Sequence, residues 1–171
     1  MNRRQQSEPP DLAVGYMERT RKLYSSQPAY RWASFDPESE PPPFTPIAKP
    51  LSSLRIALIA SGGVYRKEQE PFHFRNDTSQ REIAIDSEIA DLRVSHFGYD
   101  IKDAQLDPGC VLPLRALREL AAEGVIGSLV DPALSFMGGI YSTRLVGEEV
   151  APRFLDFVLR QQADLAYLVP A

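Results

Sequence analysis

The stretch LRIALIASGGVY, residues Leu54–Tyr65, decides the fold that we expect for this chain. Its first seven residues, Leu54–Ala60, are aliphatic or β-branched apart from Arg55, and they stop at Ser61-Gly62-Gly63. An apolar run of this length that ends in glycine is typical of a buried central strand followed by a tight turn. We therefore expect a central strand at 54–60 and a ligand face at the turn.

A helix and a strand further along the chain indicate how the sheet is built. Pro113–Glu123 is the strongest helix signal, because proline suits the first turn and the leucines share one face. Gly124 is placed to end this helix in a left-handed cap. The apolar run Val125–Val130 follows at once and reads as a third buried strand. Helix, glycine and apolar strand form half of a βαβ unit, which predicts a parallel sheet.

Shorter signals complete the predicted fold class, which is α/β with a three-layer, mostly parallel, Rossmann-like sheet and an extended N-terminal arm. Residues 64–81 show no clear periodicity and are expected to form a long polar loop. The other expected elements are a short strand at Leu92–His96, a glycine turn at Phe136–Gly139, a helix from near Gly147 to Arg160, and a last strand at Ala163–Val169.

The first 50 residues differ from the rest, so we divide the chain into an arm at 1–50 and an α/β domain at 51–171. Residues 11–25 fit an amphipathic helix. Seven prolines between Gln27 and Pro50 predict an extended segment, because proline lacks the amide proton of regular structure. The aromatic residues of this segment favour packing across the domain or a neighbouring subunit over a free linker.

Composition excludes several classes of function. A formal charge of −4 over 171 residues gives no basic excess for nucleic acid or an anionic membrane. No apolar run approaches the length of a membrane span and no secretory signal is evident, so we expect a cytoplasmic protein. One cysteine, Cys110, and two histidines exclude an internal disulfide and argue against a metal cluster. We expect no metal and no cofactor.

Ligands of open parallel sheets bind beyond the carboxyl ends of the strands, and this rule selects the candidate residues. The glycine turn is either an anion cradle, whose freed amides meet a substrate carboxylate, or a tight turn that simply needs glycine. The candidates at this edge are Ser61, Gly62, Gly63, His96, Asp131 and Gly138-Gly139.

Four residues remain open between a functional and a structural role. Arg81 and Glu82 are candidates for a carboxylate clamp with its own counter-charge, or for an ordinary ion pair. His96 is a candidate acid or base, or a hydrogen-bonded structural residue. We expect Cys110 to be a buried, inert thiol rather than a reactive one.

Four runs of sequence carry a resemblance to a known family. They are ASGGVYRKEQEPFHFRNDTSQREI (Ala60–Ile83), RVSHFGYD (Arg93–Asp100), DPGCVLPLRALRELAAEGVIGSL (Asp107–Leu129) and FMGGI (Phe136–Ile140). Over roughly Leu54–Ala171 the chain resembles the glycine/sarcosine/betaine/D-proline reductase selenoprotein B family. The resemblance implies the substrate-side subunit of an enzyme that reductively cleaves a C–N bond in an amino acid or a betaine.

The family's selenocysteine or cysteine lies in a turn directly after a strand that resembles Ala163–Pro170, and this sequence stops at Ala171. In this family a selenolate or thiolate must attack the substrate. Cys110 does not match the position of the family's selenocysteine or cysteine. We therefore expect a family member that lacks its own catalytic residue and binds a small carboxylate or amino-acid-like ligand. We expect it to act with a partner subunit or as a homo-oligomer. The alternative is a non-catalytic carboxylate-binding or scaffold protein of the same fold.

Overall fold

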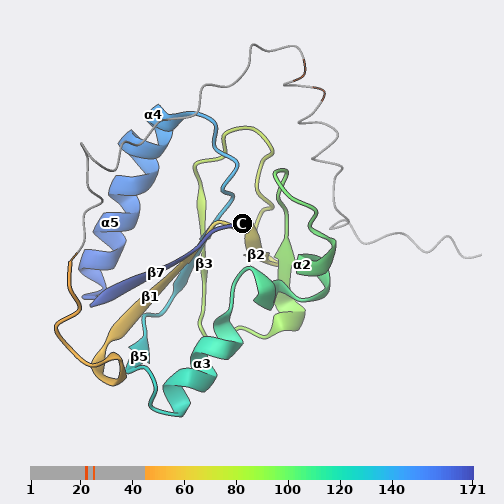
Figure 1. Ribbon diagram of the computed structural model, residues 1–171. Helices are drawn as coiled ribbons and strands as arrows, with labels where there is room; N and C mark the ends of the chain where they lie inside the picture. The colour runs from red at the N-terminus through yellow and green to blue at the C-terminus, as the bar shows by residue number, and fades with distance from the viewer. Residues whose placement is uncertain (1–21, 23–24, 26–44) are drawn as a thin grey trace, which may run out of the picture.

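The computed structural model describes Lys22, Ser25 and residues 45–171 (Figure 1). The helix expected at 11–25 and most of the proline-rich segment lie outside the described residues. Within the described part, no helix has both the length and the apolar character needed to cross a membrane. A short 3₁₀ turn, η1 (Leu51–Ser53), leads into the sheet.

Strand β1 (Arg55–Ala60) is the central strand of a mostly parallel sheet, as the sequence predicts. Strand β7 (Leu165–Val169) runs parallel to one side of β1. On its other side β1 pairs first with β5 (Ser128–Leu129) and then with β6 (Ala133–Phe136), both parallel. Strand β3 (Gln80–Ile83) joins β6 antiparallel and forms the edge opposite β7 (Figure 1).

The prediction of a strand at Val125–Val130 is only partly confirmed. Val125 is exposed, regular pairing is limited to β5, and the chain resumes as β6 after Asp131-Pro132. Proline interrupts a ladder because it has no amide proton. Asp131 therefore lies in the connection between β5 and β6, which pair one after the other with the same strand, β1. Its carboxylate accepts a hydrogen bond from the Ile85 amide at 3.1 Å. Its expected place at the carboxyl edge of the sheet was wrong.

The expectation of one long loop at 64–81 was also wrong at both ends. The glycine turn leads directly into β2 (Val64–Arg66), and the segment ends in β3. Strand β2 pairs antiparallel with β4 (Leu92–Val94), which follows the 3₁₀ turn η2 (Ile89–Asp91). The strand predicted at 92–96 is thus present, but it belongs to a separate two-stranded sheet.

Helix α3 (Leu114–Ala122) confirms the predicted helix, and Gly124 follows it with φ of +73°. The second predicted helix begins earlier than expected. It runs through α4 (Thr143–Leu145), the π-helical turn η4 (Val146–Val150) and α5 (Ala151–Arg160), with Ser142 as its N-cap. The short elements α2 (Lys102–Leu106) and η3 (Pro108–Cys110) were not predicted.

Alternate residues of β1 pack against different helices, as side chains on a strand must. Ile56 and Leu58 belong to the core cluster that contains the buried leucines of α3. Ala57 and Ile59 belong to the cluster that contains Phe157 of α5. A third cluster of Tyr65, Phe72, Phe97 and Met137 lies beyond the carboxyl end of β1 and supports the candidate site.

Candidate functional site at the carboxyl end of the sheet

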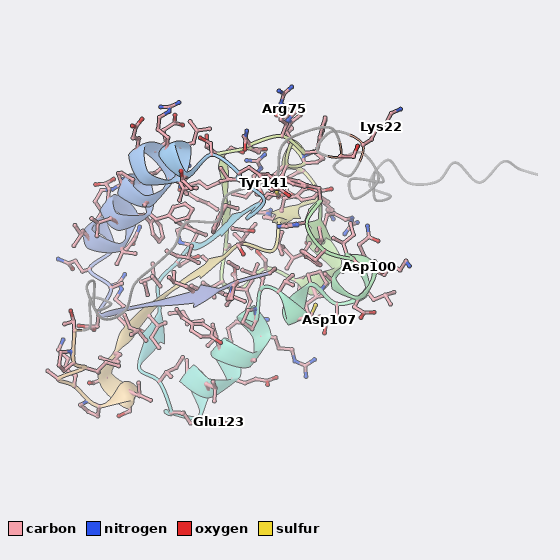
Figure 2. All side chains as sticks on the ribbon, turned by 45° about the horizontal axis from the view of Figure 1, so that its top comes forward. Lys22, Arg75, Asp100, Asp107, Glu123 and Tyr141 are labelled. Carbon is pink, nitrogen blue, oxygen red and sulfur yellow. The ribbon has the colours of Figure 1, made fainter. Side chains whose placement is uncertain are left out.

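A small cavity of about 220 Å³ lies where β1, β6 and β7 end. Its walls come from the segment after β4, the glycine turn after β6 and the segment after β7. The residues that line it are His96, Gly98, Gly138, Gly139, Ile140, Tyr141 and Ala171. In Figure 2, Tyr141 lies on the opposite side of the domain from Glu123, which follows α3. A site of this size suits a small molecule.

None of the three residues of the Ser61-Gly62-Gly63 turn lines this cavity, but the turn contacts the lining residues Gly138 and Ala171 through Ser61. The amides of the turn mainly serve the fold. The amide of Ser61 donates to the carbonyl of Val169 at 2.9 Å, and the amide of Gly63 donates to the carbonyl of Phe136 at 2.9 Å. The hydroxyl oxygen of Ser61 accepts a hydrogen bond from the amide of Ala171 at 2.9 Å. The turn therefore joins β1 to both neighbouring strands, and its Ser61 and Gly63 amides are already used.

His96 is a buried neutral side chain. Its Nδ1 accepts a hydrogen bond from the Gly98 amide at 2.9 Å, which places the proton of the neutral ring on Nε2. That Nε2 atom is buried and has no hydrogen-bond partner of good geometry among the described residues. Burial lowers the pKa of His96 to about 4, although the backbone of Ser61 acts in the opposite direction. At neutral pH the ring is uncharged and its Nε2–H group is a hydrogen-bond donor. The ring is therefore not a protonated acid, and Nε2 is not a base.

Two aromatic neighbours hold the ring of His96. The ring centroids of His96 and Tyr99 are 4.6 Å apart, and those of His96 and Phe97 are 5.8 Å apart. The hydroxyl of Tyr99 donates to the carbonyl of Gly62 at 2.9 Å, and burial raises the pKa of Tyr99. These contacts fix the imidazole against the glycine turn.

The low pKa of His96 predicts a loss of stability in mild acid. The ordinary pKa of 6.5 applies to the unfolded chain, so between about pH 6.5 and 4 the unfolded state binds more protons than the folded state. The free energy of unfolding should fall by about 2–3 kcal/mol as the pH drops through this range. Urea denaturation at a series of pH values measures the slope. His96→Gln should flatten it, and an unchanged slope in that variant would assign the effect to other groups.

Arg81 and Glu82 are not brought to the cavity. The guanidinium of Arg81 donates to the carbonyl of Glu70 at 2.9 Å and to the hydroxyl of Ser79 at 2.9 Å. It also lies 4.4 Å from the ring centroid of Phe72. Its donors therefore hold the segment between β2 and β3 in place.

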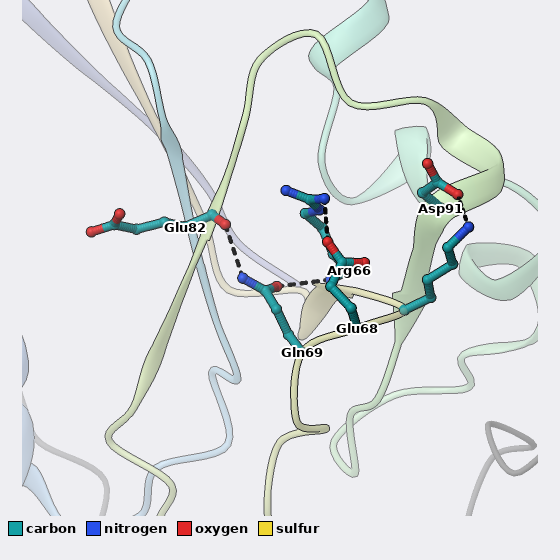
Figure 3. Close-up of polar contacts among 6 residues, drawn as sticks. Arg66, Glu68, Gln69, Glu82 and Asp91 are labelled. Carbon is teal, nitrogen blue, oxygen red and sulfur yellow. Dashed lines mark hydrogen bonds and ion pairs between the residues drawn. The ribbon is translucent and has the colours of Figure 1, made fainter.

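Glu82 contributes to the same segment through its backbone. Its carbonyl accepts a hydrogen bond from Nε2 of Gln69 at 3.0 Å, while its carboxylate points away from this contact (Figure 3). The Oε1 of Gln69 in turn accepts from the Arg66 amide at 2.8 Å. Because neighbouring residues of a strand face opposite sides, Arg81 and Glu82 do not form one clamp.

Sequence reasoning missed Gly98, Ile140, Tyr141 and Ala171 as cavity residues. The amide of Tyr141 donates to the side-chain oxygen of Asn76 at 3.0 Å, which ties the turn after β6 to the segment before β3. Its ring lies 6.1 Å from that of Phe97. The signal in the sequence was an aromatic residue two positions after Gly139, and the contact of its amide with Asn76 depends on the tertiary fold.

Cys110 lies in η3 and does not line the cavity. The expectation that it is buried was wrong, because it is exposed. Desolvation and the nearby Asp107 carboxylate raise the pKa of its thiol, which disfavours a reactive thiolate. No group of three potential metal ligands occurs in the described part of the chain.

Comparison with known families and proteins gives a consistent result. The family model described as Glycine/sarcosine/betaine reductase selenoprotein B (GRDB) matches residues 33–156. D-proline reductase subunit gamma of Acetoanaerobium sticklandii is 34% identical over 132 residues, which cover 77% of this chain and 54% of that protein. No solved structure matches the chain.

Two further relatives are components of reductase complexes. Glycine reductase complex component B subunit gamma of Symbiobacterium thermophilum is 34% identical over 131 residues, covering 71% of this chain and 29% of that protein. Sarcosine reductase complex component B subunit beta of Peptoclostridium acidaminophilum is 32% identical over 123 residues, which cover 67% of this chain and 28% of that protein. The chain thus spans about half the length of the first relative and under a third of the other two.

Proposed function

The chain belongs to the glycine/sarcosine/betaine reductase selenoprotein B family, and we propose that it forms the substrate-side part of a reductase complex. The proposed substrate is a small amino acid or betaine. In the reaction its C–N bond breaks, the carbon gains a hydrogen and the nitrogen leaves as an amine. Two thiols, or a thiol and a selenol, supply the two electrons and become a disulfide or selenosulfide. The family match over most of the chain carries this proposal.

The cavity at the carboxyl end of the sheet supports the substrate-side role. It has the size for a small carboxylate, and the Nε2–H group of His96, which has no hydrogen-bond partner among the described residues, is a donor for a carboxylate oxygen. We propose that the ligand lies against His96 and the turn Ser61-Gly62-Gly63. Arg81 and Glu82 are left out of this proposal, because their contacts hold the segment between β2 and β3.

We propose that the attacking thiolate or selenolate lies outside residues 1–171. Cys110 is outside the cavity and its raised pKa disfavours the thiolate. The same observation favours a second candidate function, a non-catalytic carboxylate-binding or scaffold protein. The two functions differ in turnover, since only the first gives amine release when a dithiol and the partner subunits are added.

The broader arrangement is part of the same proposal. Helices α3 and α5 pack against opposite faces of β1, which supports a three-layer, Rossmann-like domain at 51–171 after an arm at 1–50. We propose that the protein is cytoplasmic and works with a partner subunit or as a homo-oligomer. The subunit names of the relatives support the partner.

Ile140→Trp tests the site directly, because a larger side chain at the cavity wall fills the space. Titration calorimetry with glycine, sarcosine, betaine and D-proline should show saturable binding of at least one of them. Ile140→Trp should weaken that binding by more than tenfold. The matched control is Leu106→Trp on α2, where the side chain is 84% exposed and does not line the cavity, and it should leave binding unchanged.

Glycinamide, in which an uncharged amide replaces the carboxylate, serves as the ligand control. Binding of glycine but not glycinamide supports recognition of the carboxylate. If none of the four carboxylates binds, or if Ile140→Trp binds as well as the unmodified protein, the cavity is not the substrate site. In that case the proposed function would have to rest on another surface.

A further inference from the structure

Two glycines form part of the cavity wall at residues 138–141. Gly138 and Gly139 offer no side chains, so the backbone of this wall has more conformational freedom than most segments. The amide of Ile140 donates to the carbonyl of Gly138 at 2.8 Å, which is a bond within the wall itself. The shape of the cavity therefore depends on how the two ends of the wall are attached to the rest of the chain.

Hydrogen bonds to other segments attach both ends of this wall. At one end, the amide of Gly138 donates to the carbonyl of Ser61 in the turn after β1, at 2.9 Å. At the other end, the amide of Tyr141 donates to Oδ1 of Asn76 at 3.0 Å. The first acceptor is a backbone carbonyl, which any residue supplies. The second acceptor is a side chain, so this end depends on which residue stands at position 76.

Asn76 combines two properties that this position needs. Its φ of +45° lies in the left-handed region, which asparagine and aspartate enter more readily than most residues with a Cβ atom. Its side-chain oxygen accepts the hydrogen bond, and that oxygen is the one atom of an asparagine side chain that can accept. Aspartate offers both properties, whereas glycine offers the backbone conformation without the acceptor.

The segment around Asn76 has contacts that do not involve the Asn76 side chain. The carboxylate of Asp77 accepts a hydrogen bond from the amide of His73 at 2.6 Å, which closes the turn between them. The carbonyl of Thr78 accepts a hydrogen bond from the guanidinium of Arg153 on α5. The segment should therefore keep its structure when the side chain of residue 76 is removed.

Tyr141 also belongs to the aromatic contacts that reach His96. The ring centroids of Tyr141 and Phe97 are 6.1 Å apart, with 27° between the ring planes. Those of Phe97 and His96 are 5.8 Å apart, with 22° between the planes. The position of the Tyr141 backbone therefore affects both the wall and the stack of rings that ends at the imidazole.

We propose that Asn76 is a positioning residue of the candidate site, which holds the wall at 138–141 and the ring of Tyr141 where a ligand fits against His96. Asn76 acts through the Tyr141 amide and is not among the residues that line the cavity. This inference rests on the proposed function, because it needs a ligand in this cavity. The segment between β2 and β3 then contributes to the site through Asn76, although Arg81 and Glu82 do not.

Asn76→Gly tests the role of the acceptor, because glycine adopts a positive φ without strain. Titration calorimetry is carried out with glycine, sarcosine, betaine and D-proline. The loss of one hydrogen bond should weaken binding by about tenfold for each of these that the unmodified protein binds. Asn76→Asp keeps an acceptor and should bind within about threefold of the unmodified protein in about 0.5 M NaCl, which screens the added charge.

Gln162→Gly is the matched control. Gln162 is another residue with a positive φ, +52°, and it does not line the cavity. Its replacement by glycine makes the same kind of backbone change without removing a contact to the wall. Gln162→Gly should therefore bind each ligand as the unmodified protein does.

Hydrogen exchange of the Tyr141 amide, followed by NMR, tests the attachment without a ligand. Exchange should be faster in Asn76→Gly than in the unmodified protein, and Asn76→Asp should restore the slower rate. Urea denaturation of the same variants measures global stability. Equal stability with faster exchange would place the change in the wall and not in unfolding of the whole domain.

Three outcomes would overturn the inference and leave the proposed function in place. Asn76→Gly could bind a carboxylate as tightly as the unmodified protein does, or Asn76→Asp could fail to restore binding. In the third, a loss of global stability accounts for the faster exchange, which assigns Asn76 to the fold and not to the site. If the unmodified protein binds none of the four carboxylates, the proposed function fails, and the role of Asn76 fails with it.

Discussion

Gly63→Ala is expected to destabilise the protein by about 4 kcal/mol or more. Gly63 has φ of +71°, a conformation that costs energy for any residue with a Cβ atom. A Cβ at this position would lie 2.1 Å from the carbonyl oxygen of Ser95. That oxygen belongs to the backbone, and the Ser95 amide itself donates to the carbonyl of Gly63 at 2.9 Å. The two segments cannot separate without breaking the contact between β1 and the segment after β4.

Gly124→Ala is the matched control for this prediction. Gly124 has nearly the same backbone conformation, with φ of +73°, but no atom lies within 4 Å of the Cβ that alanine would add. Gly124→Ala should lower the free energy of unfolding by about 1 kcal/mol, which is the cost of the backbone conformation alone. Urea denaturation followed by circular dichroism measures both variants. Equal losses in the two would show that the close approach at Ser95 adds nothing.

The elements that the sequence predicts well are those whose signals are local. Strand β1 is a continuous apolar run, and α3 combines proline, a leucine face and Gly124. Strand β7 is likewise apolar throughout. For these segments, the hydrophobic periodicity and the position of glycine are enough to predict the element, and contacts from elsewhere in the chain do not change it.

The errors arise where long-range pairing decides the structure. Asp131 follows an apolar run and looked like a strand exit, but the strand continues after Pro132 because β6 can still pair with β1. Residues 64–66 are too short to show a period, and only β4 makes them a strand. The donors of Arg81 are used by Glu70 and Ser79, which no local rule selects.

The candidate site shows the same division. The carboxyl-end rule correctly gathers Ser61, His96 and Gly138-Gly139 at one edge, because strand order is enough for that placement. It says nothing about the protonation of His96, which depends on burial and on the Gly98 amide. The sequence therefore places these residues near one cavity without fixing their chemistry.

Phe97→Ala is expected to lower the free energy of unfolding by about 3–5 kcal/mol. Phe97 is only 2% exposed, and its ring packs between those of His96 and Tyr141. The ring also lies directly against Gly139, where an added Cβ would come within 2.2 Å of it. Removing the ring leaves a void beneath the cavity wall that the backbone of the glycine turn does not fill.

The same substitution should also abolish ligand binding at the cavity, because His96 and Tyr141 lose the ring that separates and positions them. Phe97→Leu keeps most of the volume and should cost about 1–2 kcal/mol. Leu106→Ala, at an exposed position, should cost less than about 0.5 kcal/mol. Urea denaturation gives the three free energies. A loss under about 1 kcal/mol in Phe97→Ala would mean that the cluster below the cavity re-forms without the ring, and that the wall holds its shape by the backbone contacts of the glycine turn alone.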